Sequence, residues 1–93
     1  MPRFPEHFIH QVQQATDIVD LISQYVALKR KGSEYVGLCP FHEDHHPSFG
    51  VNAEENYWHC FAGCGGGSVI DFWMKWQRCD FKTAVKELAR MVL

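Results

Sequence analysis

The sequence predicts an α+β domain in which a small antiparallel sheet is flanked by N-terminal and C-terminal helices. Two observations support this prediction. Near both ends of the chain, apolar residues recur three and four residues apart, as on one face of a helix, whereas the middle holds short runs rich in aromatic and β-branched residues. With 93 residues, the chain is long enough for one domain, over residues 1–93, and too short for two.

Two helices are predicted in the N-terminal part, over about residues 5–15 and 17–26. Thr16 or Asp17 can cap the second of them, because each carries a side-chain oxygen that can accept a hydrogen bond from the first turn. Apolar residues of the second helix then recur at i, i+3, i+4 and i+7, namely Ile18, Leu21, Ile22 and Tyr25. The first helix has a weaker apolar stripe, made of Phe8, Val12 and Ala15.

Two further helices are predicted in the C-terminal part, over about residues 68–77 and 80–92. Ser68 with Asp71 three residues later favours the start of the first, and Asp80 can cap the second. The apolar stripes of these two helices are Val69, Phe72, Trp73 and Trp76, and Phe81, Ala84, Val85, Leu88 and Val92.

The sheet is predicted between about residues 35 and 64, with helices on both sides of it. Strands are expected at residues 35–38, 48–52 and 56–60, with a hairpin turn at residues 53–55. The basic run at residues 29–31 is predicted to break the preceding helix just before the first strand. The glycine run at residues 65–67 lacks the pattern of a phosphate-binding loop and is predicted to form a turn.

Composition and charge restrict the function. The chain has no apolar stretch of about 20 residues and no apolar core of a signal peptide near its start, so we expect a cytoplasmic protein that does not enter a membrane. In a reducing compartment its four cysteines favour metal binding over disulfides. The formal net charge of −2 means that any nucleic-acid binding must use a local basic patch.

The strongest signal is a pattern of metal ligands, C-x2-H-x17-C-x3-C, formed by Cys39, His42, Cys60 and Cys64. Two residues between the first two ligands let one tight turn direct both at a common point. The long interval lets a hairpin bring the second pair to the same place. Three thiolates and one imidazole suit zinc in donor type and in geometry, so we predict one Zn²⁺ ion.

The second pair of ligands leaves alternatives open, because three residues rather than two separate Cys60 from Cys64. A left-handed conformation at Gly63 or Gly65 would absorb the extra residue. Other possible ligands are His45, His46 and His59. His59 and Cys60 point to opposite faces of their strand, so only one of them can face the metal. Cys60 is preferred because a thiolate is the better partner for two other cysteines.

Four protein ligands fill the coordination shell of a tetrahedral zinc ion, which indicates a structural site, and no catalytic residue is predicted. Such a site can contribute on the order of 10 kcal/mol to folding, which a sheet this small needs. Cys79 has no donor at ligand spacing and is interpreted as an unpaired thiol at a helix boundary.

A family resemblance is carried by the segments TDIVDLI (residues 16–22), GLCPFH (37–42), PSF (47–49) and HCF (59–61), and it continues to Ala84 and Val85. These segments resemble the zinc-binding domain of DnaG-type bacterial DNA primases, the CHC2 zinc finger family. The resemblance implies a zinc-ribbon-like domain with Cys39, His42, Cys60 and Cys64 as zinc ligands.

The resemblance also implies a function in DNA replication. The domain would contact the single-stranded DNA template and help to select the site at which an RNA primer begins. Polymerisation of ribonucleotides would take place in a separate RNA polymerase domain, present in cis or in trans. The full-length protein would act with a replicative helicase.

Candidate contacts to single-stranded DNA combine cations for the backbone with aromatic rings for the bases. The cations are Lys29, Arg30 and Lys31, and the aromatic candidates are Tyr35, Phe49, Tyr57, Trp58 and Phe61. Because neighbouring residues of a strand point to opposite faces, half of these rings must face the core.

Two other functions remain open. A zinc-stabilised protein-docking module within a replication complex is favoured by Trp73, Trp76 and the last helix, which could leave apolar surface for a polymerase domain. A self-contained zinc enzyme is disfavoured, because the ligand set is closed and no catalytic base stands near it.

Overall fold

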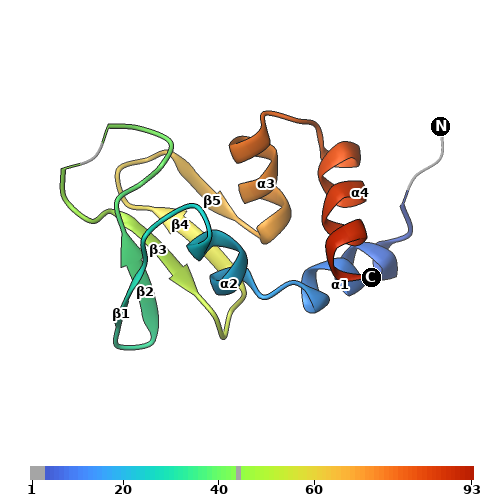
Figure 1. Cartoon of the computed structure of the whole chain (residues 1–93), viewed down its shortest axis with the longest axis horizontal. Helices are drawn as coiled ribbons and strands as arrows, with labels where there is room; N and C mark the ends of the chain where they lie inside the picture. The colour runs from blue at the N-terminus through green and yellow to red at the C-terminus, as the bar shows by residue number, and fades with distance from the viewer. Residues whose placement is uncertain (1–3, 44) are drawn as a thin grey trace.

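The fold consists of a twisted sheet and a group of helices packed against one face of it (Figure 1). The computed structural model describes residues 4–43 and 45–93. Within these residues the elements in chain order are α1 (Glu6–Ala15), α2 (Ile18–Ser23), β1 (Lys29–Lys31), β2 (Glu34–Gly37), β3 (Phe49–Asn52), β4 (Tyr57–Cys60), β5 (Gly65–Gly67), α3 (Val69–Gln77) and α4 (Phe81–Val92). The predicted α+β fold class is therefore confirmed.

The sheet is an antiparallel meander in which each strand pairs with the next, in the order β1-β2-β3-β4-β5. Its register decides which residues share a face. Val51 lies opposite Tyr35 on one side and Trp58 on the other, and this row faces the helices. Gly50 lies between Val36 and His59 in the next row, which points the opposite way.

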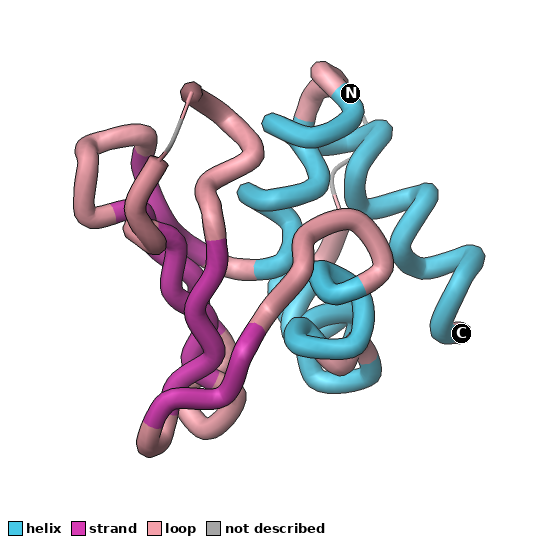
Figure 2. The backbone as a smooth tube through the Cα atoms, turned by 60° about the vertical axis from the view of Figure 1, so that its left-hand side comes forward, coloured by secondary structure: helices cyan, strands magenta, loops and turns pink. Residues whose placement is uncertain are grey.

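The face turned away from the helices is called here the outer face. Its residues are Lys29, Lys31, Glu34, Val36, Gly50, Asn52, Tyr57, His59 and Gly66. Figure 2 shows the strands on one side of the molecule and the helices on the other. The expectation of helices on both sides of the sheet is therefore wrong, and the outer face carries no helical layer among the described residues.

The core lies between the inner face of the sheet and the helices. Phe49, Trp58 and Phe72 are fully buried, and the ring centroid of Phe41 lies 5.5–6.2 Å from each of theirs. The indole Nε1 of Trp58 donates a hydrogen bond of 2.9 Å to the backbone oxygen of Ser68, which ties β4 to the start of α3. Each such ring contributes about 1.5–3 kcal/mol by its burial.

Side-chain caps begin three of the helices, as their sequences indicate. Asp17 accepts from the backbone N–H of Asp20 at α2, and Asp80 accepts from that of Thr83 at α4. Hydrogen bonds from Thr83 lower the pKa of Asp80. At α3, Ser68 and Asp71 form the reciprocal capping box that their spacing predicts.

Three segments differ from their sequence predictions. Lys29–Lys31 is the first strand rather than a break before it, because Gly32 (φ 65°) and Ser33 form a two-residue hairpin that returns the chain along β2. Gly65–Gly67 is the fifth strand rather than a turn. α2 ends at Ser23, three residues before its predicted end.

The glycines of β5 permit a close approach that other residues would prevent. A Cβ atom at Gly66 would lie 2.7 Å from the backbone oxygen of Trp58 on the neighbouring strand.

Among the described residues, no helix has the length and apolar character needed to cross a bilayer.

Candidate metal centre and the adjoining sheet face

The four predicted zinc ligands come together at one end of the sheet. Cys39 follows β2, His42 lies in the next turn, Cys60 is the last residue of β4, and Cys64 immediately precedes β5. Their ligand atoms all lie within 4.8 Å of one another. Two sulfurs on a tetrahedral zinc ion are about 3.8 Å apart for Zn–S bonds of about 2.3 Å, so these donors fit one ion.

Each pair of ligands is positioned by a turn of the backbone. In the first turn, the N–H of Phe41 donates to Cys39 Sγ at 3.4 Å. In the second, the N–H of Gly63 donates to the oxygen of Cys60 at 3.1 Å. Gly63 and Gly65 have φ angles of 95° and 118°, so the extra residue of this turn is absorbed at glycines, as predicted.

His42 presents its Nδ1 atom to the cluster. This atom lies 2.8 Å from Cys64 Sγ and 3.9 Å from Cys60 Sγ. Cys39 and Cys60 are buried, with 4% and 7% of their surfaces exposed. His42 and Cys64 are partly exposed. Three thiolates and an imidazole nitrogen would hold Zn²⁺ in a closed shell, and the ion would supply structural cross-linking.

The thiol pKa values differ within the cluster. Burial raises the pKa of Cys39 to about 12 and also raises that of Cys64. Burial acts in the same direction on Cys60, but hydrogen bonds from the backbone N–H groups of Cys64 and Ala62, with smaller effects of Ser48 and Cys39, bring the pKa of Cys60 down to about 6. Within the cluster, Cys60 is thus the thiol whose pKa is lowered rather than raised.

Lys75 is a residue of this site that the sequence prediction missed. Its ammonium lies 5.4 Å from the ring centroid of Phe41, and its charge acts to lower the pKa of Cys64. Three thiolates around Zn²⁺ leave a net charge of −1, which Lys75 partly offsets. No local motif links a lysine on α3 to the cysteines, so only the packing of α3 against β5 reveals it.

The alternative ligands lie elsewhere. His59 is on the outer face, opposite to Cys60, and the exposed His45 and His46 are absent from the ligand cluster found among the described residues. Cys79 also lies outside that cluster, and burial, together with Glu87 and Asp80, raises the pKa of its thiol.

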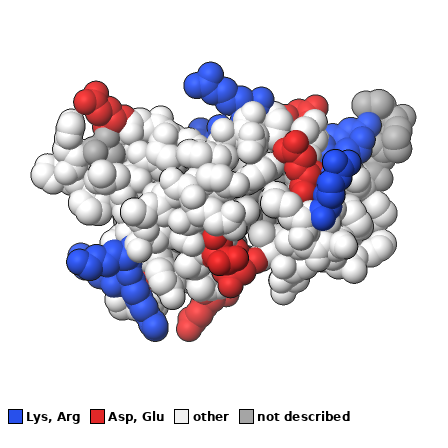
Figure 3. Space-filling model, viewed as in Figure 1, with Lys and Arg blue, Asp and Glu red and all other residues white. Residues whose placement is uncertain are grey.

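The register divides the eight candidate DNA-contacting residues into two sets. Lys29, Lys31 and Tyr57 are on the outer face. Phe61 directly follows β4 two residues after His59, so it continues this side, and it is 71% exposed. Basic side chains are visible over β1 at the lower left of Figure 3.

The other four candidates point to the inner side of the sheet. Phe49 and Trp58 are fully buried in the core, so bases cannot stack on them, and this part of the prediction is corrected. Tyr35 is half-buried against the core cluster. Arg30 shares the row of Tyr35, although its position on the edge strand leaves it exposed.

Two residues of the outer face were missed as candidates. The ring of His59 lies between those of Tyr57 and Phe61, with centroid distances of 5.5 and 4.2 Å. Glu34 reaches toward His59 from β2. The i, i+2, i+4 spacing of Tyr57, His59 and Phe61 is visible in the sequence. Whether these three residues face the solvent or the core depends on the register of the strand, which the sequence does not give.

Several known proteins are similar to this chain in sequence. A family model described as the CHC2 zinc finger matches residues 4–93. The chain is 49% identical over 92 residues to the DNA primase of Listeria monocytogenes, covering 98% of this chain and 14% of that protein. It is 47% identical over 90 residues to the DNA primase of Escherichia coli K12, covering 96% of this chain and 15% of that protein.

A solved structure shows the same fold. The chain superimposes on the Aquifex aeolicus primase, whose structure contains zinc-binding and RNA polymerase domains, with a TM-score of 0.85 and 38% identity. The match covers 91% of this chain and 21% of the other. The chain thus spans only a small part of the length of the primases that it resembles.

Proposed function

Since the chain belongs to the CHC2 zinc finger family, we propose that it acts as the template-contacting domain of a DNA primase and helps to select where RNA primers begin. The observation that carries this proposal is the outer face. It combines a row of three rings, Tyr57, His59 and Phe61, with two lysines of the edge strand, Lys29 and Lys31.

The geometry of this face suits unpaired bases. The ring centroids of Tyr57, His59 and Phe61 follow one another at 5.5 and 4.2 Å, wider than the roughly 3.4 Å spacing of stacked bases. Bases resting on successive rings would therefore be separated from one another, as in a single strand. Stacking on an aromatic ring contributes roughly 1–3 kcal/mol per base, and lysines would contact the phosphates.

The zinc site would fix this platform in place. Cys60 ends the strand that carries Tyr57 and His59, and Phe61 is the next residue. A zinc ion with four protein ligands would thus anchor the end of the aromatic row. The net charge of the chain is −2, and few lysines would face the DNA. The domain alone should therefore bind single-stranded DNA weakly and in a salt-dependent way.

If the domain is attached to a larger protein, its weak contacts with DNA would be sufficient to hold the template. The Aquifex relative contains an RNA polymerase domain besides its zinc-binding domain. A domain of that kind, in cis or in trans, would perform the chemistry, while the present chain would raise the local concentration of template beside it.

A fluorescence titration with short single-stranded DNA at two salt concentrations tests the face. The double variant Lys29→Ala/Lys31→Ala should bind more weakly and lower the slope of log affinity against log salt by about 1.4, or about 0.7 for each phosphate that a lysine no longer neutralises. Arg30→Ala is the matched control, because it removes a charge from the same strand on the other side of the sheet. For a comparison at equal charge, the single variant Lys29→Ala is measured beside Arg30→Ala, and equal decreases in affinity would contradict a specific role of the outer face.

Selection of the initiation site has its own test. The zinc-loaded chain, added in trans to a primase that lacks its N-terminal domain, should restore primer synthesis at specific sites, and Phe61→Ala should restore it less. Undiminished rescue by Phe61→Ala would remove the aromatic row from site selection.

A docking function is the second candidate, favoured by exposed apolar side chains on α4 and at the residue that follows it. Phe81, Met91 and Leu93 are 43%, 51% and 57% exposed. Of the two tryptophans expected at this surface, only Trp76 is partly exposed. Trp73 is buried and donates to Glu87 at 2.8 Å, and Trp76 stacks on Phe72. Failure of rescue by a folded, zinc-loaded chain would favour docking over template contact.

A further inference from the structure

A hollow of about 390 Å³ opens on the outer face between the β1–β2 hairpin and Phe61. Its size falls within the range of about 300–1,000 Å³ that is usual for small-molecule sites. The lining combines an aromatic ring (Phe61), an apolar surface (Val36), a cation (Lys31) and a carboxylate (Glu34). This set offers a stacking surface, a phosphate contact and a hydrogen-bond acceptor within one site.

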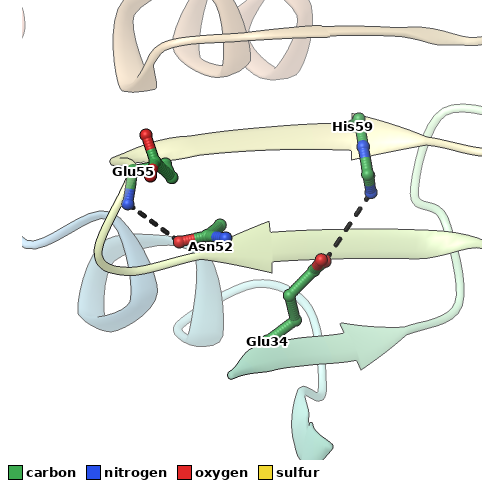
Figure 4. A network of polar contacts seen from close by, with 4 residues as sticks. All are labelled: Glu34, Asn52, Glu55 and His59. Atoms are coloured by element: carbon green, nitrogen blue, oxygen red, sulfur yellow. Dashed lines mark hydrogen bonds and ion pairs between the residues drawn. The ribbon is translucent and has the colours of Figure 1, made fainter. Parts of the chain in front are cut away.

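The carboxylate of Glu34 lies close to the ring of His59. Figure 4 shows Glu34 on β2 and His59 on β4 pointing toward each other across β3. Glu34 Oε1 lies 3.7 Å from His59 Nε2, and the side chains are only 31% and 29% exposed. His59 Nε2 itself is buried and makes no hydrogen bond among the described residues.

Gly50 makes this approach possible. It lies on β3 between the two side chains, and a Cβ atom there would be 2.9 Å from both Glu34 Oε1 and His59 Nε2. Any larger residue would push the two groups apart. The glycine therefore leaves a gap on the outer face through which side chains of two non-adjacent strands meet.

A carboxylate is an unfavourable group on a surface for single-stranded DNA, because it repels phosphates. It is favourable toward bases, since it accepts hydrogen bonds from exocyclic amino groups, as in contacts of Glu with cytosine N4. We infer that this hollow holds one nucleobase of the template and that Glu34 selects a base with an exocyclic amino group. The inference rests on the proposed function and adds a specificity-determining residue to it.

Base chemistry decides which template base is disfavoured. Cytosine, adenine and guanine each carry an exocyclic amino group that can donate to Glu34. Thymine has none, and its ring N–H stands between two carbonyl oxygens that repel a carboxylate. His59 would act as a positioning residue, since its ring lies beside the carboxylate and continues the aromatic row beside the base.

Binding of oligo-dC and oligo-dT of equal length to the zinc-loaded chain tests this inference. The two pyrimidines have similar size and differ at the edge that Glu34 would contact. We expect wild type to bind oligo-dC about tenfold more tightly, within the range for one good base contact. Glu34→Ala should bring the ratio close to one and should bind oligo-dT more tightly than wild type does, because a repulsive charge is removed.

Two further variants separate base selection from net charge. Glu55→Ala removes the same charge from the exposed β3–β4 turn, so it should strengthen binding to both oligomers alike and keep their ratio. Glu34→Gln keeps the size of the side chain and offers an N–H to thymine O4, so it too should lose the preference.

The outcomes distinguish the two levels of the proposal. A wild-type preference that persists in Glu34→Ala, or equal binding of both oligomers by wild type, would overturn the inference and leave the proposed function standing. Binding of neither oligomer by the zinc-loaded wild type would reject both.

Discussion

At the scale of single residues, Trp58 shows how one side chain connects the sheet to the helices. Its ring is fully buried among Phe41, Phe49 and Phe72, and its N–H donates to the oxygen of Ser68. The two interactions act together, because the hydrogen bond orients the ring that fills the core. Trp58 thus joins the strand of the aromatic row to the helix that follows β5.

Trp58→Phe should lower the free energy of unfolding by about 2–3 kcal/mol, because it removes one of the two hydrogen bonds to the Ser68 oxygen, leaving that from the Phe72 N–H, and opens a small cavity. Urea denaturation of the zinc-loaded protein measures this change. Tyr57→Phe is the control, since it alters the neighbouring half-buried ring on the outer face and should shift stability by less than about 0.5 kcal/mol. Equal midpoints for wild type and Trp58→Phe would contradict the assigned role.

At the scale of elements, α3 depends on its first turn. Ser68 Oγ accepts from the N–H of Ile70 at 3.1 Å, and the N–H of Ser68 donates to Asp71 Oδ2 at 2.8 Å. This helix also carries Phe72 into the core and Lys75 to the metal centre. Its start is therefore important to both.

Ser68→Ala should lower the free energy of unfolding by about 1 kcal/mol, the usual cost of removing a side-chain cap. Thermal or urea unfolding can measure the decrease, with Ser33→Ala in the exposed hairpin as the matched control. A decrease of the same size in both variants would show that the cap contributes nothing specific.

The strands illustrate which elements a sequence can reveal. β3 and β4 have aromatic and branched residues, and they were predicted within one residue of their observed bounds. β1 consists of three charged residues and β5 of three glycines, compositions that local preference assigns to turns. Both are edge strands, where backbone pairing with a single neighbour suffices and lysine discourages pairing with other chains.

At the scale of the whole molecule, the metal should determine whether the sheet exists. Structural zinc contributes roughly 10–16 kcal/mol in small zinc domains, as much as the entire stability of a typical domain. Removal of zinc by a strong chelator should therefore abolish the cooperative unfolding transition, and added Zn²⁺ should restore it. Circular dichroism together with a zinc-release assay would follow this change, and a chain that keeps its native spectrum without metal would contradict the structural role.

The metal site was predictable because its ligands are reactive residue types at restricted spacing. The surface around it was not. The register of the strands, which is a property of the packed sheet, decides which rings face outward. It places Tyr57 and Phe61 outward and Phe49 and Trp58 in the core. The meeting of Glu34 with His59 likewise requires three strands in place and a glycine between them.

The separation of the two faces of the sheet has an evolutionary consequence. Each strand contributes alternate residues to the apolar interior and to the open surface, so substitutions at the exposed positions, unlike those at the close-packed Gly50 and Gly66, leave the interior unchanged. Exposed substitutions typically alter stability by no more than about 0.5 kcal/mol. Under the proposed function, a lineage could therefore acquire a new template preference through single mutations on this surface while the scaffold beneath it stayed intact.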